Sequence, residues 1–217
     1  MYHNFIYVSK HNNKVKKAYS NAINLLEEAQ KIIKEKHNMT FAYYVVGSYK
    51  RNMLTYDPKT NIGFDFDFNI VFNNKHGYSA AQLKNALREA LNKIADKYQF
   101  DYPEDSTRVL TLKVKDRKNS KIVYSIDLAV VNKEFTKYIH FNKASFIREN
   151  AYQWQGMPLG YNDFSNKFEA LKNSEYEERL KEDYLRQKNA NNDNNIHSRE
   201  ILIQTVNNVY NFMRLHR

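Results

Sequence analysis

Apolar and small side chains recur at every third or fourth position along residues 12–36, with lysines and glutamates between them. This spacing is typical of an α-helix that buries one face. Residues 83–98 repeat the pattern, after a Ser79 and Gln82 pair with capping-box spacing. The sequence therefore predicts two amphipathic helices, whose apolar positions are Val15, Ala18, Ala22, Leu25, Leu26, Ala29, Ile32, Ile33, Leu83, Leu87, Ala90, Leu91, Ile94 and Tyr98.

Other stretches have the patterns of strands. Residues 41–46 (FAYYVV) are aromatic and β-branched and end at Gly47-Ser48, which indicates a buried strand followed by a turn. Residues 64–72 (FDFDFNIVF) alternate between apolar and polar side chains. Residues 107–115 and 121–131 also alternate and are joined by the polar segment DRKNS, which predicts a β-hairpin.

Beyond about residue 135 the strand signal fades, and helical patterns cover residues 175–188 and 198–215 on either side of an Asn-rich segment. The chain has no internal repeat and no Gly/Ser linker. We therefore expect an α+β fold in which residues 1–135 form a core with a mixed, twisted β-sheet and residues 136–217 form a helical C-terminal lobe.

Three aspartates interrupt these strands. Asp65 and Asp67 are two positions apart, so they project from the same face of their strand, close enough to contact one divalent cation or a pair about 4 Å apart. Asp127 is a lone acid on the polar face of the 121–131 strand. Without a cation, neighbouring carboxylates repel each other and lose hydration, which costs stability. The simpler reading of FDFDF is an amphipathic strand with one solvated face.

Composition narrows the class of protein. The 217 residues are 42% hydrophobic, enough for a buried core, and include no cysteine, so a metal would need oxygen or imidazole ligands, which favours Mg²⁺. The net charge of +10 favours polyanionic partners, nucleotides or nucleic acid, although an AT-rich genome also yields many lysines. The N-terminus lacks a signal-peptide pattern and no apolar run could cross a bilayer, so we expect a cytoplasmic protein without membrane contact.

The order of these motifs resembles the DNA polymerase β-like nucleotidyltransferases, which have an apolar residue before Gly-Ser, a later D-x-D strand and a third acid on another strand. Here the motifs are Val46-Gly47-Ser48, Asp65-Phe66-Asp67 and Ile126-Asp127-Leu128. The resemblance covers about residues 41–131. The helical remainder resembles the C-terminal lobe of the oligoadenylate synthase, poly(A) polymerase and bacterial cyclic-oligonucleotide synthase branch.

The resemblance implies catalytic and metal-binding roles for Asp65, Asp67 and Asp127, with Mg²⁺ as the cofactor and Mn²⁺ as a substitute. It also implies that Gly47 and Ser48 hold the outer phosphates of a nucleoside triphosphate. The reaction would be transfer of a nucleoside monophosphate to a hydroxyl of a nucleotide, an RNA or a small molecule, with release of pyrophosphate.

In the helical half, YLRQKN and IHSREI resemble the family's triphosphate-contacting helix and the serine-led helix after it, which makes Lys188 and Ser198 candidates for nucleotide binding. The competing reading is a surface lysine and an N-cap serine. The sixteen residues between Ser48 and Asp65 are more than is typical of the family.

Two alternative functions and one structural property stay open. The chain could be a non-catalytic nucleotide- or RNA-binding module on the same fold, or a toxin or antibiotic-modifying nucleotidyltransferase with a different acceptor. The sequence does not determine the oligomeric state.

Overall fold

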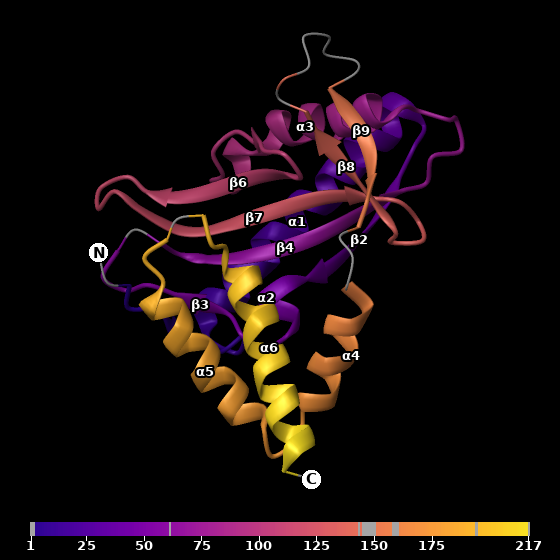
Figure 1. Cartoon of the computed structure of the whole chain (residues 1–217). Coiled ribbons are helices and arrows are strands. Elements are labelled where there is room, and N and C mark those ends of the chain that lie inside the picture. Colours follow the sequence, from indigo (N-terminus) through magenta and orange to yellow (C-terminus); the bar gives the residue numbers. More distant parts are fainter. Residues whose placement is uncertain are drawn as a thin grey trace. The chain divides into compact units, whose positions relative to one another are not determined.

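The computed structural model describes residues 3–60, 62–142, 144, 151–157, 161–193 and 195–216 (Figure 1). The chain divides into two compact units. We call Tyr7–Tyr56 with Asn61–Met157 the sheet unit, and Met1–Ile6, Asp57–Thr60 and Pro158–Arg217 the helical unit. The chain passes between the units within the short strand β1 (Ile6–Tyr7), directly after the short strand β3 (Thr55–Tyr56), and again after Thr60 and Met157.

The sheet unit contains a mixed β-sheet with the order β2-β4-β7-β6-β5, in which β8 pairs with β7 and β9. β4 and β7 are parallel, whereas the other neighbouring strands are antiparallel. This mixed sheet with its helices confirms the predicted α+β class. The strands are β2 (Phe41–Val46), β4 (Phe64–Phe72), β5 (Glu104–Asp105), β6 (Val109–Asp116), β7 (Lys121–Val131), β8 (Lys137–Phe141) and β9 (Tyr152–Gly156).

The helices of the sheet unit are α1 (Asn13–His37), α2 (Gly47–Lys50), α3 (Ala80–Ile94) and the 3-10 turn η1 (Asp96–Tyr98). Both predicted amphipathic helices are present. α3 begins directly after Ser79, whose hydroxyl accepts from the Gln82 backbone N–H while the Gln82 side chain accepts from the Ser79 N–H, so the predicted capping box is confirmed.

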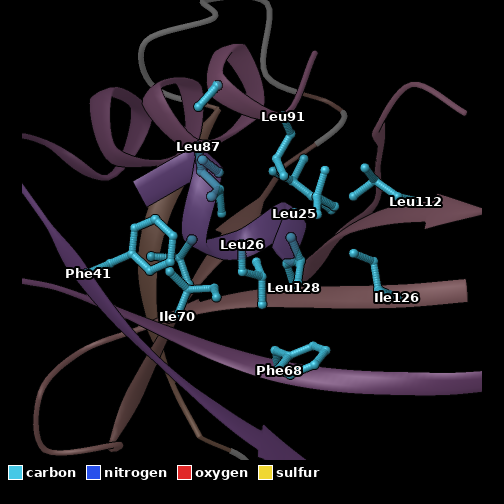
Figure 2. Packing of buried hydrophobic residues seen from close by; sticks show 14 of the residues in the cluster. Leu25, Leu26, Phe41, Phe68, Ile70, Leu87, Leu91, Leu112, Ile126 and Leu128 are labelled. Atoms are coloured by element: carbon cyan, nitrogen blue, oxygen red, sulfur yellow. The ribbon is translucent and has the colours of Figure 1, made fainter. Parts of the chain in front are cut away.

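The apolar faces of α1 and α3 pack with one face of the sheet, as Figure 2 shows. The alternation of β4 and β7 places Phe66, Phe68 and Ile126 on this face, where they are buried. Burying a side chain of this size stabilises the fold by about 1.5–3 kcal/mol. Helices therefore cover one face of the sheet, and the polar residues of the alternating strands lie on the opposite face.

β8 and β9 correct the expectation that the chain is helical beyond residue 135. They pair antiparallel over five residues each, Lys137 opposite Gly156 through Phe141 opposite Tyr152, and both lie in the sheet unit. Ile139 is fully buried. Strands of five residues are too short for a clear periodic pattern, which is why the sequence did not indicate them.

The helical unit contains α4 (Tyr161–Leu171), α5 (Glu177–Ala190) and α6 (Ser198–Leu215), of which α5 and α6 were predicted. The N-terminal segment is tied to the end of α5, because the Phe5 N–H donates to Asn189 Oδ1 at 2.6 Å and Asn189 Nδ2 donates to the Phe5 carbonyl at 3.0 Å. Among the described residues, no helix is both long and apolar enough to span a bilayer.

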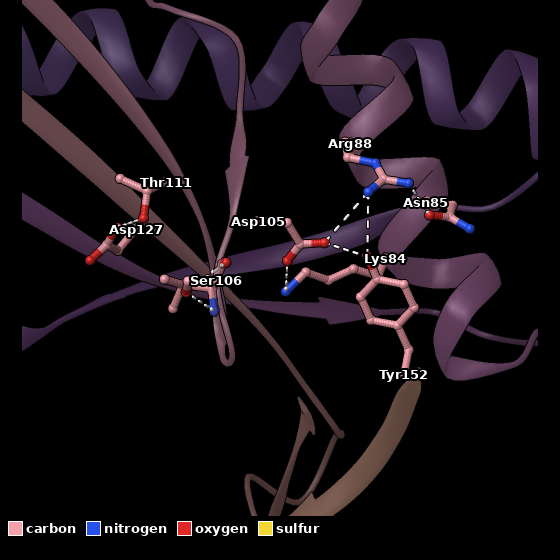
Figure 3. A network of polar contacts seen from close by, with 9 residues as sticks. Lys84, Asn85, Arg88, Asp105, Ser106, Thr111, Asp127 and Tyr152 are labelled. Carbon is pink, nitrogen blue, oxygen red and sulfur yellow. Dashed lines mark hydrogen bonds and ion pairs between the residues drawn. The ribbon is translucent and has the colours of Figure 1, made fainter. Parts of the chain in front are cut away.

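A charged network is buried in the sheet unit between α3, β5 and β9 (Figure 3). Lys84 is 0% exposed, and its Nζ lies 3.4 Å from Asp105 Oδ1. Arg88 Nη1 lies 3.5 Å from Asp105 Oδ2, to which the Tyr152 hydroxyl also donates a hydrogen bond. The Asp105 carboxylate on β5 therefore links α3, through Lys84 and Arg88, with β9, through Tyr152.

The network shifts the pKa of two of its members. Burial lowers the pKa of Lys84 against the opposing effect of Asp105. Burial and the bonded carboxylate raise the pKa of Tyr152 to about 12.

Candidate active site

The structure places the three aspartates on one face of the sheet, the face opposite the helices. β4 and β7 are adjacent parallel strands in which Asp67 is the register partner of Asp127 and Asp65 that of Ser125. Adjacent strands are about 4.8 Å apart, and register partners project to the same side. The sequence predicted the face of each acid on its own strand, and the parallel pairing brings the two faces together.

The carboxylates accept hydrogen bonds from neighbouring hydroxyls. Ser125 Oγ donates to Asp65 Oδ1, and Thr111 Oγ1 on β6 donates to Asp127 Oδ1 at 2.5 Å (Figure 3). Over the part of the chain that the structure describes, no three carboxylate or imidazole side chains converge closely enough to hold a metal ion. The backbone thus sets the acids side by side, and joint coordination of an ion would require their side chains to rotate away from these hydroxyls.

The electrostatics of the acid face favour a cation. Burial raises the pKa of Asp127 to about 6, and the nearby carboxylates of Asp65 and Asp67 act in the same direction, whereas the Thr111 hydrogen bond and Lys113 oppose the rise. Carboxylate oxygens are the donors that Mg²⁺ and Mn²⁺ prefer. The donor set and the repulsion among its members therefore fit a divalent ion held by residues of β4 and β7.

The raised pKa predicts how Asp127→Asn changes stability. Between about pH 4, where an unfolded aspartate loses its proton, and about pH 6, where folded Asp127 does, the folded chain holds more protons, so its stability falls as pH rises. An asparagine at this position has no charge to bury. We expect the variant to be more stable than the wild type by about 1–3 kcal/mol at pH 8, and equally stable near pH 4. Urea unfolding in EDTA measures this, and an equal gain at both pH values would contradict it.

Gly47 lies against the Asp67 carboxylate. β2 ends at Val46, the register partner of Asp67, and Gly47 then adopts a left-handed conformation with φ of +68°. A Cβ on Gly47 would lie 1.7 Å from Asp67 Oδ2, so only glycine fits here. Ser48 follows in the single turn of α2, whose Tyr49 ring stacks on Tyr19 with centroids 4.6 Å apart. The predicted turn thus brings the Gly-Ser pair to the edge of the acid face.

Gly47→Ala is expected to lower any activity of this site by about 10- to 100-fold, because the new methyl group displaces the Asp67 carboxylate. The left-handed backbone also costs about 1–2 kcal/mol of stability in a residue with a Cβ. Gly77→Ala is a matched control, since Gly77 has a φ of +67° but open space around its Cβ position. Urea unfolding of both variants measures the cost of the left-handed backbone, and turnover measures the effect of displacing the Asp67 carboxylate. Equal losses of activity in the two would contradict the role of Gly47.

Lys188 and Ser198 lie in the helical unit, and the acids in the sheet unit. Lys188 Nζ lies 4.2 Å from the centroid of the Phe5 ring and 5.9 Å from that of Tyr184. Ser198 is the first residue of α6 and not its N-cap, which is His197, whose N–H donates to Glu200 Oε2 at 3.1 Å. The assignment of Lys188 and Ser198 to phosphate binding stays a prediction.

Ser125 and Thr111 are neighbours of the acids that we did not single out from the sequence. The alternation of β7 places Ser125 on the same face as Asp127, which was a usable signal. Thr111 is opposite Asp127 only because of the β6–β7 register, and that register includes a shift between Val114 and Lys115. A bulge of this kind moves the pairing by one residue, so the sequence of the hairpin did not predict it.

No known protein-family model matches the chain. No curated protein sequence matches it significantly. Solved structures do: Vibrio cholerae DncV in its 3'-deoxy ATP bound form matches with a TM-score of 0.61 and 13% identity over 94% of this chain and 68% of that chain. The V. cholerae DncV cyclic AMP-GMP synthase, described as a prokaryotic cGAS homolog, matches with a TM-score of 0.52 and 13% identity over 85% of this chain and 61% of that one.

The GTP bound form of DncV matches with a TM-score of 0.54 and 13% identity over 91% of this chain and 52% of that chain. This chain therefore spans about half to two-thirds of the length of these structures. At this level of identity the likeness establishes the fold alone, which is that of DncV.

Proposed function

We propose that the chain is a magnesium-dependent nucleotidyltransferase that transfers a nucleoside monophosphate from a nucleoside triphosphate to a hydroxyl acceptor and releases pyrophosphate. The observation that carries the proposal is the pairing of Asp67 with Asp127 on adjacent parallel strands, with the Gly47 turn packed on Asp67. The fold shared with DncV, which has been solved with 3'-deoxy ATP and with GTP, supports the same reaction class.

In this proposal Asp65, Asp67 and Asp127 would hold Mg²⁺ or Mn²⁺, and the bound ion would supply neutralisation of phosphate charge and a lower pKa of the attacking hydroxyl. The hydroxyls of Ser125 and Thr111, which bond Asp65 and Asp127, would give up these hydrogen bonds as the carboxylates turn toward the ion.

The Gly47-Ser48 turn is assigned to the outer phosphates. Because Gly47 has no side chain, its backbone can approach a phosphate that also touches the Asp67 site. Lys188 and Ser198 are assigned to the triphosphate on the family resemblance. Basic residues exceed acidic residues by ten over the whole chain, which favours binding of anionic substrates.

The test is incubation of the purified protein with each labelled nucleoside triphosphate and Mg²⁺ or Mn²⁺, with and without bulk RNA. The wild type is expected to release pyrophosphate and form a new phosphodiester or phosphoester product, and an Asp65→Ala/Asp67→Ala variant is expected to form none. Full activity in the double variant would overturn the assignment of the acids. Nucleotide binding by the wild type without turnover under every condition would favour the non-catalytic binding module.

A further inference from the structure

Two aromatic rings are exposed on the acid face of the sheet. Tyr44 on β2 is 48% exposed, and Phe135, in the turn between β7 and β8, is 39% exposed. The rings meet edge to face, with centroids 5.2 Å apart and an interplanar angle of 80°. Large exposed apolar side chains that cluster, in contrast to scattered single ones, commonly mark a binding site. We call Tyr44 and Phe135 the aromatic pair.

The backbone of the turn holds Phe135 in this exposed position. Phe135 has a φ of +56°, a left-handed conformation that is a genuine outlier for a bulky residue. Asn132 compensates for the strain, because its Oδ1 accepts from the backbone N–H of Thr136 at 2.9 Å and of Lys137 at 2.7 Å. The Phe135 N–H donates to the Asn132 carbonyl at 3.0 Å. Hydrogen bonds within the turn therefore hold its backbone, and the turn presents the Phe135 ring against Tyr44.

The register places the pair beside the acids. Val46 is opposite Asp67 and Tyr44 is opposite Asn69, so Tyr44 lies two residues further along the sheet, about 7 Å from the row that contains Asp67 and Asp127. Gly47 lies on the other side of that row. The acids thus lie between the Gly47-Ser48 turn and the aromatic pair.

In nucleotidyl transfer the attacking and leaving oxygens are roughly in line on opposite sides of the reacting phosphorus. With the leaving pyrophosphate at Gly47-Ser48, the acceptor approaches from the side where Tyr44 and Phe135 lie. Stacking on an aromatic face is a general way to hold a base, and each base gains from it without a specific sequence. Neither ring carries a charge that could pair with an acidic or basic group of a drug or a protein.

We infer that the acceptor is a nucleotide, free or at the end of a strand, whose base stacks on the face of one ring of the aromatic pair and contacts the other ring edge-on. This inference rests on the proposed function, because the acceptor side is defined by the outer phosphates at Gly47-Ser48. It selects a nucleobase-bearing acceptor over an antibiotic or a protein side chain.

The experiment is equilibrium binding of AMP, GMP, CMP and UMP, with inorganic tripolyphosphate as a probe that has phosphates but no base. Tyr44→Ala and Phe135→Ala are expected to weaken the tightest mononucleotide by about 5- to 100-fold and to leave tripolyphosphate affinity unchanged. Tyr44→Phe keeps the ring and is expected to bind like the wild type. Tyr102→Ala is the matched control, because Tyr102 is 69% exposed and lies outside the aromatic pair.

Equal mononucleotide affinity in the wild type and both alanine variants would overturn the inference, and so would a wild type that binds none of the four mononucleotides. Either result leaves the proposed function standing if the wild type still releases pyrophosphate from a triphosphate and Asp67→Asn does not. A parallel loss of tripolyphosphate affinity in Tyr44→Ala would also count against a base-stacking role. Absence of both mononucleotide binding and pyrophosphate release would end both proposals.

Discussion

Asp67→Asn is expected to lower the rate of nucleotidyl transfer by about 100- to 1000-fold or more, while the protein stays folded. Asparagine has the shape of aspartate and keeps the contact with Gly47, but it has no charge with which to hold a divalent ion. Ion-based stabilisation of the transition state is worth several kcal/mol, and each 1.4 kcal/mol is a factor of about ten in rate. Steady-state pyrophosphate release measures the effect.

Asp116→Asn is the matched control for this variant. Asp116 is also a strand carboxylate of the sheet unit, but it lies at the turn of the β6–β7 hairpin, where it bonds Asn119. Its neutralisation is expected to leave the rate of nucleotidyl transfer within about twofold of the wild-type rate, since exposed polar contacts contribute little to stability. Asp67→Asn that retained more than about a tenth of wild-type turnover would contradict a metal-binding role for Asp67. Any binding of RNA through the net positive charge, which would weaken with salt, is expected to survive in both variants.

Asp105→Ala is expected to destabilise the fold by about 3–5 kcal/mol, because it leaves the fully buried Lys84 ammonium without its partner. The same substitution removes the acceptor of the Tyr152 hydroxyl and the anion next to Arg88. Adding Lys84→Met to Asp105→Ala removes the buried charge and is expected to recover most of the loss, as replacement of a whole buried ion pair often does. Urea unfolding of the single and double variants measures both effects.

Glu104→Ala is the control for burial. Glu104 Oε2 pairs with Lys113 Nζ at 2.6 Å, but the Glu104 side chain is 57% exposed. An exposed ion pair contributes about 0–1 kcal/mol, so the loss of stability is expected to stay in that range. A loss as large as that of Asp105→Ala, or a double variant no more stable than Asp105→Ala alone, would show that the buried charge is not the cause.

The elements with a strong period could be predicted from the sequence. The alternation of Phe64–Phe72 gave the bounds and the buried face of β4, and the Ser79 and Gln82 pair located the start of α3. These features are local, since each depends on side chains a few residues apart. β8 and β9 were missed because they are short and are stabilised by pairing with each other, which is not a local property of either segment.

The candidate site was predictable only in part. Alternation assigned Asp65, Asp67 and Asp127 to the polar faces of their strands, and the motif order indicated that those strands meet, but the partner register of Asp67 and Asp127 is a property of the assembled sheet. The left-handed Phe135 has no local sequence signal, because bulky residues rarely adopt that conformation. Lys84 reads as a solvent-facing lysine on α3, and its burial depends on Asp105 in a strand of two residues.

The most direct test of the account is a crystal structure of the protein with Mn²⁺ and a non-hydrolysable nucleoside triphosphate, in which anomalous diffraction locates the ion. We expect Asp65 and Asp127 to have turned from Ser125 and Thr111, and the ion to lie within coordinating distance of carboxylates from both β4 and β7. Bound triphosphate with Mn²⁺ elsewhere, and with the Asp127 carboxylate still directed at Thr111 alone, would contradict the account.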